Sequence, residues 1–414
     1  MRILYLAHRI PYPPDKGDKI RSFHEIKHLS RGHEVHLLAF CDRTEDLRHA
    51  EELKHYCRSV SLVKLVPWIQ TLRVVTAMSL GKPWSLGYFA NREMRNALKA
   101  RLAEQDFDLI FVYCSSMAPY VEHLKLPPKI LDFVDSDACK WDQYATAKNF
   151  PANWLYRYEA KRLKDFEVRM LDCFECCTFV SPREAAHIPD QTRARVMFIP
   201  NGVDLDSFAP TFSDPVSRTI VFTGTMDYFP NVDAVTFFTL EVLPKIRQVF
   251  SDARFMIVGS RPVQSVRKLA SLPGVTVTRT VQDVRPFIGQ ARIAVAPLRI
   301  SQGIQNKVLE ALATGLPVVA SPTAAAGFQK MEHVPLVLAE SPTAFADVVC
   351  DLLRRPPLGP EQVRLCREQL RLHYDWATNL AVFDQIIRQF DPFNTAPADT
   401  IPQTRMPTGR SASC

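Results

Sequence analysis

The sequence predicts an α/β protein built from two Rossmann-like domains, and three observations carry this prediction. The chain has 414 residues, which is too long for one ordinary hydrophobic core and suits two domains of about 200 residues each. Hydrophobic residues make up 47% of the chain and charged residues 23%, an ordinary globular composition. Short buried strands alternate with helices almost from end to end, which indicates parallel sheets covered by helices on both faces.

The first half opens with an apolar strand at residues 2–7, and a loop with Pro, Gly and charged residues follows at 8–18. Apolar residues then recur near the helical spacing, with Asp18 as the candidate N-cap and Gly32 as the C-terminal cap. Helical stretches lie between most of the later strands, and the longest covers 153–171. The later strands are expected at 35–40, 59–65, 109–113, 130–134, 176–180 and 196–199.

A second, similar series of elements starts after residue 218. Its strands are expected at 220–222, 255–258, 275–278, 293–296, 317–320 and 336–338. Its helices are expected at 230–249, 284–290, 303–314, 343–355 and 360–372.

Residues 200–204, Pro-Asn-Gly-Val-Asp, stand between the two halves. Asn-Gly forms turns readily because both residues tolerate positive φ, so the segment suits a hinge between domains and, equally well, a plain surface turn. We place an N-terminal domain at 1–200 and a C-terminal domain at 204–372, followed by a docked helix at 374–392. Residues 394–414 have few apolar side chains, which predicts a disordered tail.

The charge and the targeting signals limit the partners of the chain. A net charge of +7 is a mild excess that would favour phosphate-rich ligands or an anionic membrane surface, although a solvated surface is the better interpretation for most of these charges. No basic stripe interleaved with aromatic residues and no nucleic-acid module is present, so we expect no nucleic-acid partner. The first apolar run is too short for a signal peptide and no run is long enough to cross a bilayer, so we expect a cytoplasmic protein that can touch the membrane from that side.

Ten cysteines are scattered along the chain and are expected to be free thiols. Cys173, Cys176 and Cys177 form a small cluster that invites a metal interpretation. The cluster lacks a second ligand pair at zinc-site spacing and leads into an apolar run, so we interpret these residues as buried hydrophobic side chains and expect no metal.

The segment 303–315 carries the chemistry that we expect. It follows a strand, opens with Gly303, and continues as a helix whose apolar stripe is buried. The start of such a helix presents unpaired N–H groups to an anion, and Lys307 adds a positive charge in the second turn, so a diphosphate fits there. Glu310 lies on nearly the same face and suits the hydroxyls of a ribose. An exposed Lys–Glu pair on an ordinary helix is the competing interpretation.

Loops after two other strands, and a third loop before a helix, support a site at the same edge. Gly224 and Thr225 follow the strand at 220–222, and Gly259 follows the strand at 255–258. Asp283 precedes a helix and could border a base pocket. Glycine after a strand is common in this kind of fold, so the argument depends on the recurrence of this arrangement within one half.

The residues 200–204, 303–310 and 316–320 together resemble the marks of the retaining glycosyltransferase family 4. That resemblance extends to about residue 392 and implies the GT-B fold, in which two Rossmann-like domains face each other across a cleft. The run Gly-Ile-Gln-Asn-Lys-Val-Leu-Glu at 303–310, with the opening at 7–21, is similar to the sugar transferases of exosortase (PEP-CTERM) exopolysaccharide systems.

The resemblance implies a UDP- or GDP-sugar donor bound by the C-terminal domain, an acceptor held by the N-terminal domain, and a final helix that packs back onto the N-terminal domain. Glu310 matches the glutamate that binds the donor ribose. Transfer would retain the anomeric configuration and need no metal or other cofactor. It would serve exopolysaccharide synthesis, on an acceptor that we expect to be lipid-linked. The donor residues expected on this basis are Gly224, Thr225, Arg261, Asp283, Gln302, Gly303, Ile304, Gln305, Lys307 and Glu310.

Two departures from the family pattern concern the donor site. Gln302 stands where the family has its first acid, and a glutamine can bind sugar hydroxyls but cannot act as a base. The Arg/Lys pair expected after the first strand of the second half is absent, so phosphate neutralisation would depend on Lys307 and backbone amides, helped by Arg261 or Arg299.

In the first half, Gly17, Lys19 and Arg21 lie at the first strand-to-helix junction and are expected at the cleft, where they would touch the acceptor or the donor diphosphate. Asp135 follows a strand and is our candidate catalytic carboxylate, alongside Lys307 and Glu310, to orient the acceptor hydroxyl; an N-cap role is about equally consistent. The basic, aromatic helix at 153–171 suits either a membrane surface or, as we favour, ordinary amphipathic packing.

Three functions therefore stand open. The first is a retaining glycosyltransferase that acts in polysaccharide assembly. The second is a nucleotide-sugar epimerase of the same architecture, which would turn over its donor without an acceptor. The third is a non-catalytic partner that keeps the fold, an interpretation that Gln302 supports.

Overall fold

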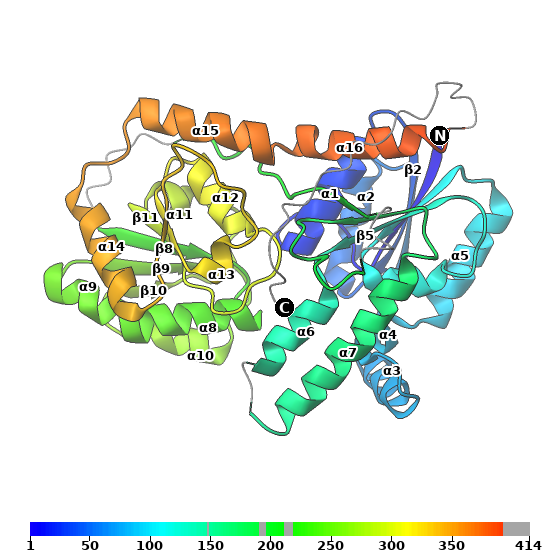
Figure 1. Cartoon of the computed structure of the whole chain (residues 1–414), viewed down its shortest axis with the longest axis horizontal. Helices are drawn as coiled ribbons and strands as arrows, with labels where there is room; N and C mark the ends of the chain where they lie inside the picture. The colour runs from blue at the N-terminus through cyan, green and yellow to red at the C-terminus, as the bar shows by residue number, and fades with distance from the viewer. Residues whose placement is uncertain (147–148, 190–195, 211–217, 392–414) are drawn as a thin grey trace. The chain divides into compact units, whose positions relative to one another are not determined.

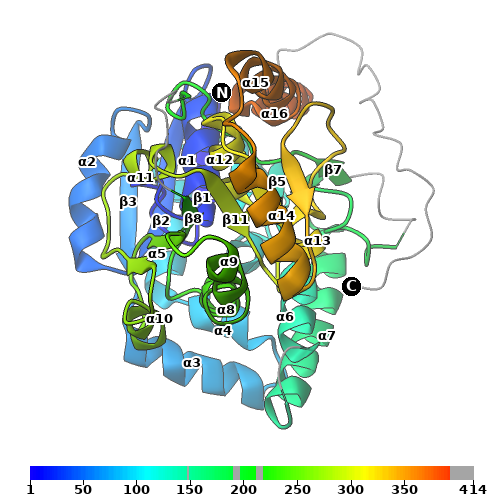
Figure 2. The ribbon, with the colours of Figure 1, turned by 90° about the vertical axis from the view of Figure 1, so that its left-hand side faces the viewer.

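A computed structural model of the chain describes residues 1–146, 149–189, 196–210 and 218–391 (Figure 1). The chain divides into two compact units, of which unit 1 comprises Met1–Pro200 with Leu380–Cys414 and unit 2 comprises Asn201–Asn379. The disordered tail expected at 394–414 lies outside the described residues. Both units are α/β, as the sequence predicts, and each contains a parallel sheet surrounded by helices (Figures 1 and 2).

The sheet of unit 1 has the strand order β3-β2-β1-β4-β5-β6-β7 and is parallel throughout. Strand β1 lies between β2 and β4, so the strand order reverses next to β1, which is the kind of switch point where α/β folds bind ligands. The strands are β1 (Arg2–Ala7), β2 (Glu34–Cys41), β3 (Ser59–Lys64), β4 (Leu109–Tyr113), β5 (Lys129–Val134), β6 (Cys176–Phe179) and β7 (Val196–Phe198).

The helices of unit 1 fill the connections between these strands. Their apolar faces and the sheet form a core in which Leu4, Val112 and Phe179 are fully buried. The α-helices are α1 (Gly17–Leu29), α2 (Ala50–Leu53), α3 (Pro67–Ser79), α4 (Trp84–Phe89), α5 (Arg92–Glu104), α6 (Asp137–Thr146) and α7 (Ala152–Met170), with 3₁₀ turns at Thr44–His49 and Ser115–Tyr120.

Unit 2 repeats the plan with the strand order β10-β9-β8-β11-β12-β13, again parallel, and its order reverses between β8 and β11. Its strands are β8 (Thr219–Thr223), β9 (Arg254–Val258), β10 (Val275–Val277), β11 (Ile293–Ala296), β12 (Val318–Ala320) and β13 (Leu336–Leu338). Its helices are α8 (Phe229–Phe237), α9 (Leu243–Val249), α10 (Gln264–Leu269), α11 (Arg285–Gly289), α12 (Asn306–Ala313), α13 (Pro322–Ala325), α14 (Pro342–Arg354) and α15 (Pro360–Tyr374).

Helix α16 (Trp376–Arg388) begins in unit 2 and ends in unit 1. Within unit 1, the ring of Phe383 packs edge-on against Phe111 of β4 at 4.9 Å, and Asp384 lies 3.0 Å from the Nε2 atom of His28. The last helix is thus part of the core of the unit that contains the N-terminus.

Three details of the predicted elements differ in the structure. The cap of α1 is Lys16, which makes no side-chain cap, and the Asp18 carboxylate binds Arg9 instead. The expected helix at 230–249 is interrupted by a π-helical turn at Phe238–Val242, just before Pro244, whose missing N–H breaks the regular hydrogen-bond ladder. The helix expected from residue 303 begins at Asn306.

The cysteine cluster lies on and before β6. Cys176 and Cys177 are buried and Cys173 is partly buried, and all three are free thiols. Burial raises the pKa of the Cys176 thiol to about 12. The Cys176 thiol is therefore protonated and apolar at neutral pH.

Candidate functional site

The carboxyl ends of β8, β9 and β11 meet at one edge of the second sheet, because parallel strands all end on the same side. Gly224 follows β8 and Gly259 follows β9, and the two loops are packed backbone against backbone: the Gly224 N–H donates to the carbonyl of Val258 at 3.0 Å. A Cβ atom at Gly259 would lie 1.7 Å from the Gly224 carbonyl oxygen, so no larger residue fits there. This close approach holds the two loops together at the switch point.

The ammonium of Lys307 lies beside the loop that contains Gly224. Its Nζ atom donates a hydrogen bond of 2.6 Å to Oδ1 of Asn231 on α8 and lies 4.1 Å from the centre of the Phe222 ring. A Cβ atom at Gly224 would approach the same Nζ atom to 3.3 Å. Burial lowers the pKa of Lys307 to about 7, although the charge of Glu310 opposes the shift. The site thus holds a cation that is poorly solvated and has a neutral amide as its hydrogen-bond partner.

Glu310 lies one turn further along α12 and is half-buried. Burial raises the pKa of Glu310 to about 7, and the charge of Lys307 opposes this shift. Asn231, and not Glu310, holds the Lys307 ammonium, so the two residues are not the solvent-exposed ion pair of the competing interpretation. Two groups with pKa values displaced toward 7 at a strand edge are a common feature of functional sites.

The loop before α12 explains why the helix starts later than predicted. Gly303 has φ of +62°, and Gln305 is extended with φ of −79° and ψ of 103°, so neither continues a helix. The loop is fixed from inside unit 2, because the Asn201 side chain donates to the carbonyl of Ile304 at 3.4 Å and to Oδ1 of Asn306 at 3.2 Å. Consequently Lys307 belongs to the first turn of α12, and the prediction of the second turn was wrong.

Two amide side chains at this edge of the sheet hold the neighbouring loops through hydrogen bonds to backbone carbonyls. Gln305 donates from Nε2 to the carbonyl of Gln302 at 2.9 Å, which closes the loop after Gly303. Asn231 donates from Nδ2 to the carbonyl of Thr225 at 2.9 Å while its oxygen accepts from Lys307. Asn231 therefore couples the β8 loop to the start of α12, and sequence analysis missed it because an asparagine inside a helix carries no motif.

The arginines that the sequence offers as helpers for a phosphate are already paired. Arg261 forms an ion pair of 3.1 Å with Asp227, and Nε of Arg299 lies 2.8 Å from Asp233. Asp283 likewise accepts from Nε of Arg285 at 2.8 Å. These exposed pairs would have to open before either arginine could serve a ligand, whereas the partner that the described residues give Lys307 is the neutral Asn231.

In unit 1 the structure contradicts the prediction for Arg21. Its side chain is fully buried against the sheet, where Nε lies 2.7 Å from Asp132 of β5 and 2.9 Å from Glu25. A further N–H donates to the carbonyl of Ile199 at 2.9 Å. Arg21 is therefore a core residue, because it lies on the face of α1 that packs on the sheet.

The two other residues of this junction are placed differently. Lys19 is buried, and its Nζ atom lies 3.2 Å from the Asp46 carboxylate, so its positive charge is paired within unit 1. Gly17 is the first residue of α1 and is exposed, with open space where a Cβ atom would be. Of the predicted trio, Gly17 is the exposed residue with open space beside it.

Asp135 lies just past the carboxyl end of β5, after Val134, which has φ of +67°. Its Oδ1 atom is buried and finds no hydrogen-bond partner among the described residues. Burial, helped by the charge of Glu184, raises the pKa of Asp135 to about 8. A strained backbone and a protonated carboxyl at a strand end are both features of functional sites.

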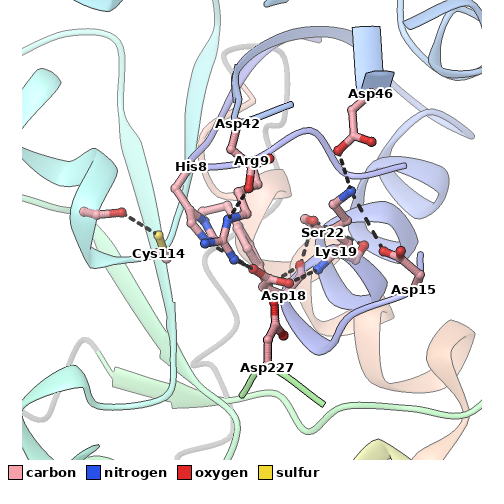
Figure 3. Close-up of polar contacts among 12 residues, drawn as sticks. His8, Arg9, Asp15, Asp18, Lys19, Ser22, Asp42, Asp46, Cys114 and Asp227 are labelled. Carbon is pink, nitrogen blue, oxygen red and sulfur yellow. Dashed lines mark hydrogen bonds and ion pairs between the residues drawn. The ribbon is translucent and has the colours of Figure 1, made fainter. Parts of the chain in front are cut away.

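A second polar cluster surrounds the carboxyl end of β1 (Figure 3). Asp18 accepts a hydrogen bond of 2.7 Å from Arg9 and lies 3.4 Å from Nε2 of His8. Burial alone would raise the pKa of Asp18, yet His8 and Arg9 hold it well below its usual value. Burial alone would lower the pKa of His8, yet Cys114 and Asp18 raise it to about 9. Sequence analysis used the segment 7–21 only for its resemblance and Asp18 only as a candidate N-cap, and it did not predict this cluster.

Three comparisons place the chain among known proteins. Residues 217–355 match the family model described as Glycosyl transferases group 1. A phosphatidyl-myo-inositol mannosyltransferase of Mycobacterium tuberculosis is 30% identical over 217 residues, which cover 47% of this chain and 53% of that protein. The chain therefore matches about half the length of the curated relatives that it resembles.

Solved structures extend the likeness to the fold of nearly the whole chain. Sucrose-phosphate synthase from Thermosynechococcus elongatus superposes with a TM-score of 0.68 at 17% identity, over 94% of this chain and 99% of that one. Anabaena HepE in complex with UDP and glucose superposes with a TM-score of 0.63 at 12% identity, over 94% and 99%. The chain thus has the α/β fold of the GT-B glycosyltransferases, and within it residues 217–355 match the Glycosyl transferases group 1 model.

Proposed function

We propose that this chain is a glycosyltransferase that takes a sugar from a UDP- or GDP-sugar bound at the switch point of unit 2. The observation that carries the proposal is the Lys307 ammonium, which Asn231 holds beside the Gly224 loop, within the segment that matches the Glycosyl transferases group 1 model. A diphosphate at this point would supply the negative charge that Lys307 lacks.

The residues around Lys307 would each contact a different part of the donor. Backbone N–H groups at the start of α12, after Gly303 and Ile304, would bind the phosphate oxygens, because the first turn of a helix has unpaired donors. Glu310 would accept hydrogen bonds from the ribose hydroxyls and would ionise as the charge of Lys307 is fixed by the phosphate. Gln302 would contact the sugar as an amide, which binds hydroxyls without charge.

Transfer would proceed with retention of configuration and without a metal. The Lys307 ammonium and the helix start would stabilise the charge that develops on the leaving diphosphate as the glycosidic bond breaks. The diphosphate would take the proton of the acceptor hydroxyl, so no protein base is required. This route is consistent with Gln302, which could not act as a base.

Asp135 is our candidate for contact with the acceptor in unit 1. Because its pKa is raised to about 8, the carboxyl is protonated at neutral pH and would donate a hydrogen bond to an acceptor oxygen. A relative named as a phosphatidyl-myo-inositol mannosyltransferase supports a lipid-linked acceptor, and the resemblance to exosortase-associated transferases supports a role in exopolysaccharide synthesis at the cytoplasmic face of the membrane.

The test is to incubate the full chain with UDP-glucose, GDP-mannose and related donors, with and without a membrane lipid extract, and to measure the UDP or GDP released. We expect release that depends on the extract and is lost in Glu310→Ala. The matched control is Glu361→Ala, which removes an exposed glutamate from α15 of the same unit. Nucleotide release at the wild-type rate by Glu310→Ala would refute the assignment.

The same assay separates the two other functions. An isomerised sugar nucleotide formed without extract would identify an epimerase. Binding of a donor without turnover on any acceptor would identify a non-catalytic partner.

A further inference from the structure

An apolar stripe runs along the outer face of α3 in unit 1. Trp68, Leu72 and Val75 recur at the spacing of one helix face, and each is between 58% and 66% exposed. Leu80, which follows the helix, is also 66% exposed. A helix on the surface of a globular protein normally turns such a stripe toward the core.

The opposite face of α3 already has its packing partner. Gly87 of α4 lies so close to α3 that a Cβ atom there would be 2.5 Å from the Cβ of Ala77. Gln70 is buried on the same side and accepts from Arg73 at 3.2 Å. The exposed stripe is thus the face that remains after α3 has packed on unit 1.

Helix α7 lies next to α3 at the outer edge of unit 1, and both views show this (Figures 1 and 2). The guanidinium of Arg162 donates to the carbonyl of Gly81, directly after α3, and stacks 3.4 Å over the Tyr158 ring. Glu159 of α7 accepts the backbone N–H groups of Trp84 and Ser85, each at 2.9 Å. These contacts fix α3, α4 and α7 as one surface.

Cations outnumber acids on this surface. Residues 64–92 contain no Asp or Glu, and their cations are Lys64, Arg73, Lys82 and Arg92. On α7 the exposed side chains Trp154, Arg157, Lys161 and Lys164 follow one another on one face, and Asp165 is the exposed acid of that helix. An apolar stripe headed by tryptophan and bordered by Lys and Arg is the composition of segments that lie in a membrane interface.

We propose that α3, together with the exposed face of α7, docks this chain on a lipid bilayer that carries anionic headgroups. The stripe of α3 would enter the interface between headgroups and acyl chains, and the cations of α7 would bind the headgroups. Among the described residues no helix is long and apolar enough to cross a bilayer, so docking through this surface is peripheral. The inference depends on α3 and α7 alone and not on the proposed transferase activity.

The test is co-sedimentation of the full chain with vesicles of phosphatidylcholine alone or with phosphatidylglycerol added, without any sugar nucleotide. We expect binding to the anionic vesicles that weakens at high salt. The variant Trp68→Ser/Leu72→Ser/Val75→Ser should bind at least about 100-fold more weakly. The variant Lys161→Glu/Lys164→Glu should lose at least about tenfold.

The matched control is Leu240→Ser/Val249→Ser/Leu372→Ser, which removes three comparably exposed apolar side chains from unit 2 and should bind as the wild type does. Brominated lipids should quench the fluorescence of Trp68 and Trp154, and Trp68→Phe/Trp154→Phe should abolish this quenching while sedimentation persists.

Three results would overturn the proposal. The first is that the wild-type protein does not bind anionic vesicles, and the second is that the α3 variant binds as well as the control. The third is that light scattering without vesicles shows a dimer that dissociates in the α3 variant. The last result would assign the stripe to a second copy of the chain.

Discussion

Nucleoside diphosphate binding is expected to weaken as the pH rises above 7, because the Lys307 ammonium loses its proton in that range. Its folded-state pKa is about 7 and its usual value is 10.5, so the folded protein with an empty site gives up this proton early. A bound diphosphate would require the charged form. Binding at alkaline pH therefore has to return a proton to Lys307, and this cost grows with pH.

The size of the effect follows from the protonated fraction of Lys307. With a pKa of about 7, that fraction falls about 25-fold between about pH 7.5 and about pH 9. Over this interval the terminal phosphate of UDP or GDP is already ionised, and Glu310, with a pKa of about 7, is mostly ionised too. The Kd should therefore rise about 25-fold, which corresponds to about 2 kcal/mol.

Isothermal titration of UDP and of GDP across this interval measures the Kd directly, and repetition in buffers of different ionisation enthalpy measures the proton uptake. The comparison variant is Lys307→Arg, whose guanidinium keeps its charge throughout, so its Kd should stay nearly constant. A wild-type Kd that is as flat as that of Lys307→Arg, with no proton uptake, would show that Lys307 does not bind the diphosphate.

Three further predictions concern stability and use urea unfolding as the measurement. Gly259→Ala should lower the free energy of unfolding by at least about 3 kcal/mol, because its Cβ would meet a backbone carbonyl. Gly17→Ala, with open space around it, should change this free energy by less than about 1 kcal/mol. Similar losses in both variants would disprove the steric argument. Arg21→Met should cost about 3–5 kcal/mol by leaving Asp132 buried without its partner, and Arg21→Met/Asp132→Leu should recover part of this loss. Asp135→Asn should raise the free energy of unfolding at about pH 8 and leave it unchanged at about pH 4. The reason is that the carboxyl has a pKa of about 8 in the folded protein and ionises near 3.8 in the unfolded chain, so its ionisation at about pH 8 favours unfolding. Equal effects at both pH values would contradict this.

The strands were predictable because their apolar runs are short and buried on both faces. Residues 109–113 and 293–296 are strands with the bounds that the sequence predicted, and their side chains are buried throughout. The start of α12 was not predictable in the same way, because a glycine can open a helix or hold a left-handed turn, and nothing local distinguishes the two. The hydrogen bonds from Asn201, about 100 residues earlier, select the turn.

Site residues were predictable where topology alone decides the position. Gly224 and Lys307 meet because both follow neighbouring strands of a parallel sheet. Arg21 was mispredicted because the sequence does not tell which face of α1 packs on the sheet, and a buried arginine is rare enough that a ligand contact was the better expectation. Its partner Asp132 lies on a strand that reads as apolar, so only the structure reveals the pair.

The placement of α16 has a consequence for the order in which the chain folds during synthesis. Unit 2 is one continuous segment, Asn201–Asn379, so it can complete its core as soon as it has left the ribosome. The unit that is made first cannot do so, because Phe383 and Asp384 cover Phe111 and His28 only after the rest of the chain has been translated. A fragment that stops at residue 200 would keep that apolar surface open and should aggregate, whereas a fragment of residues 201–379 should stay in solution as a folded domain.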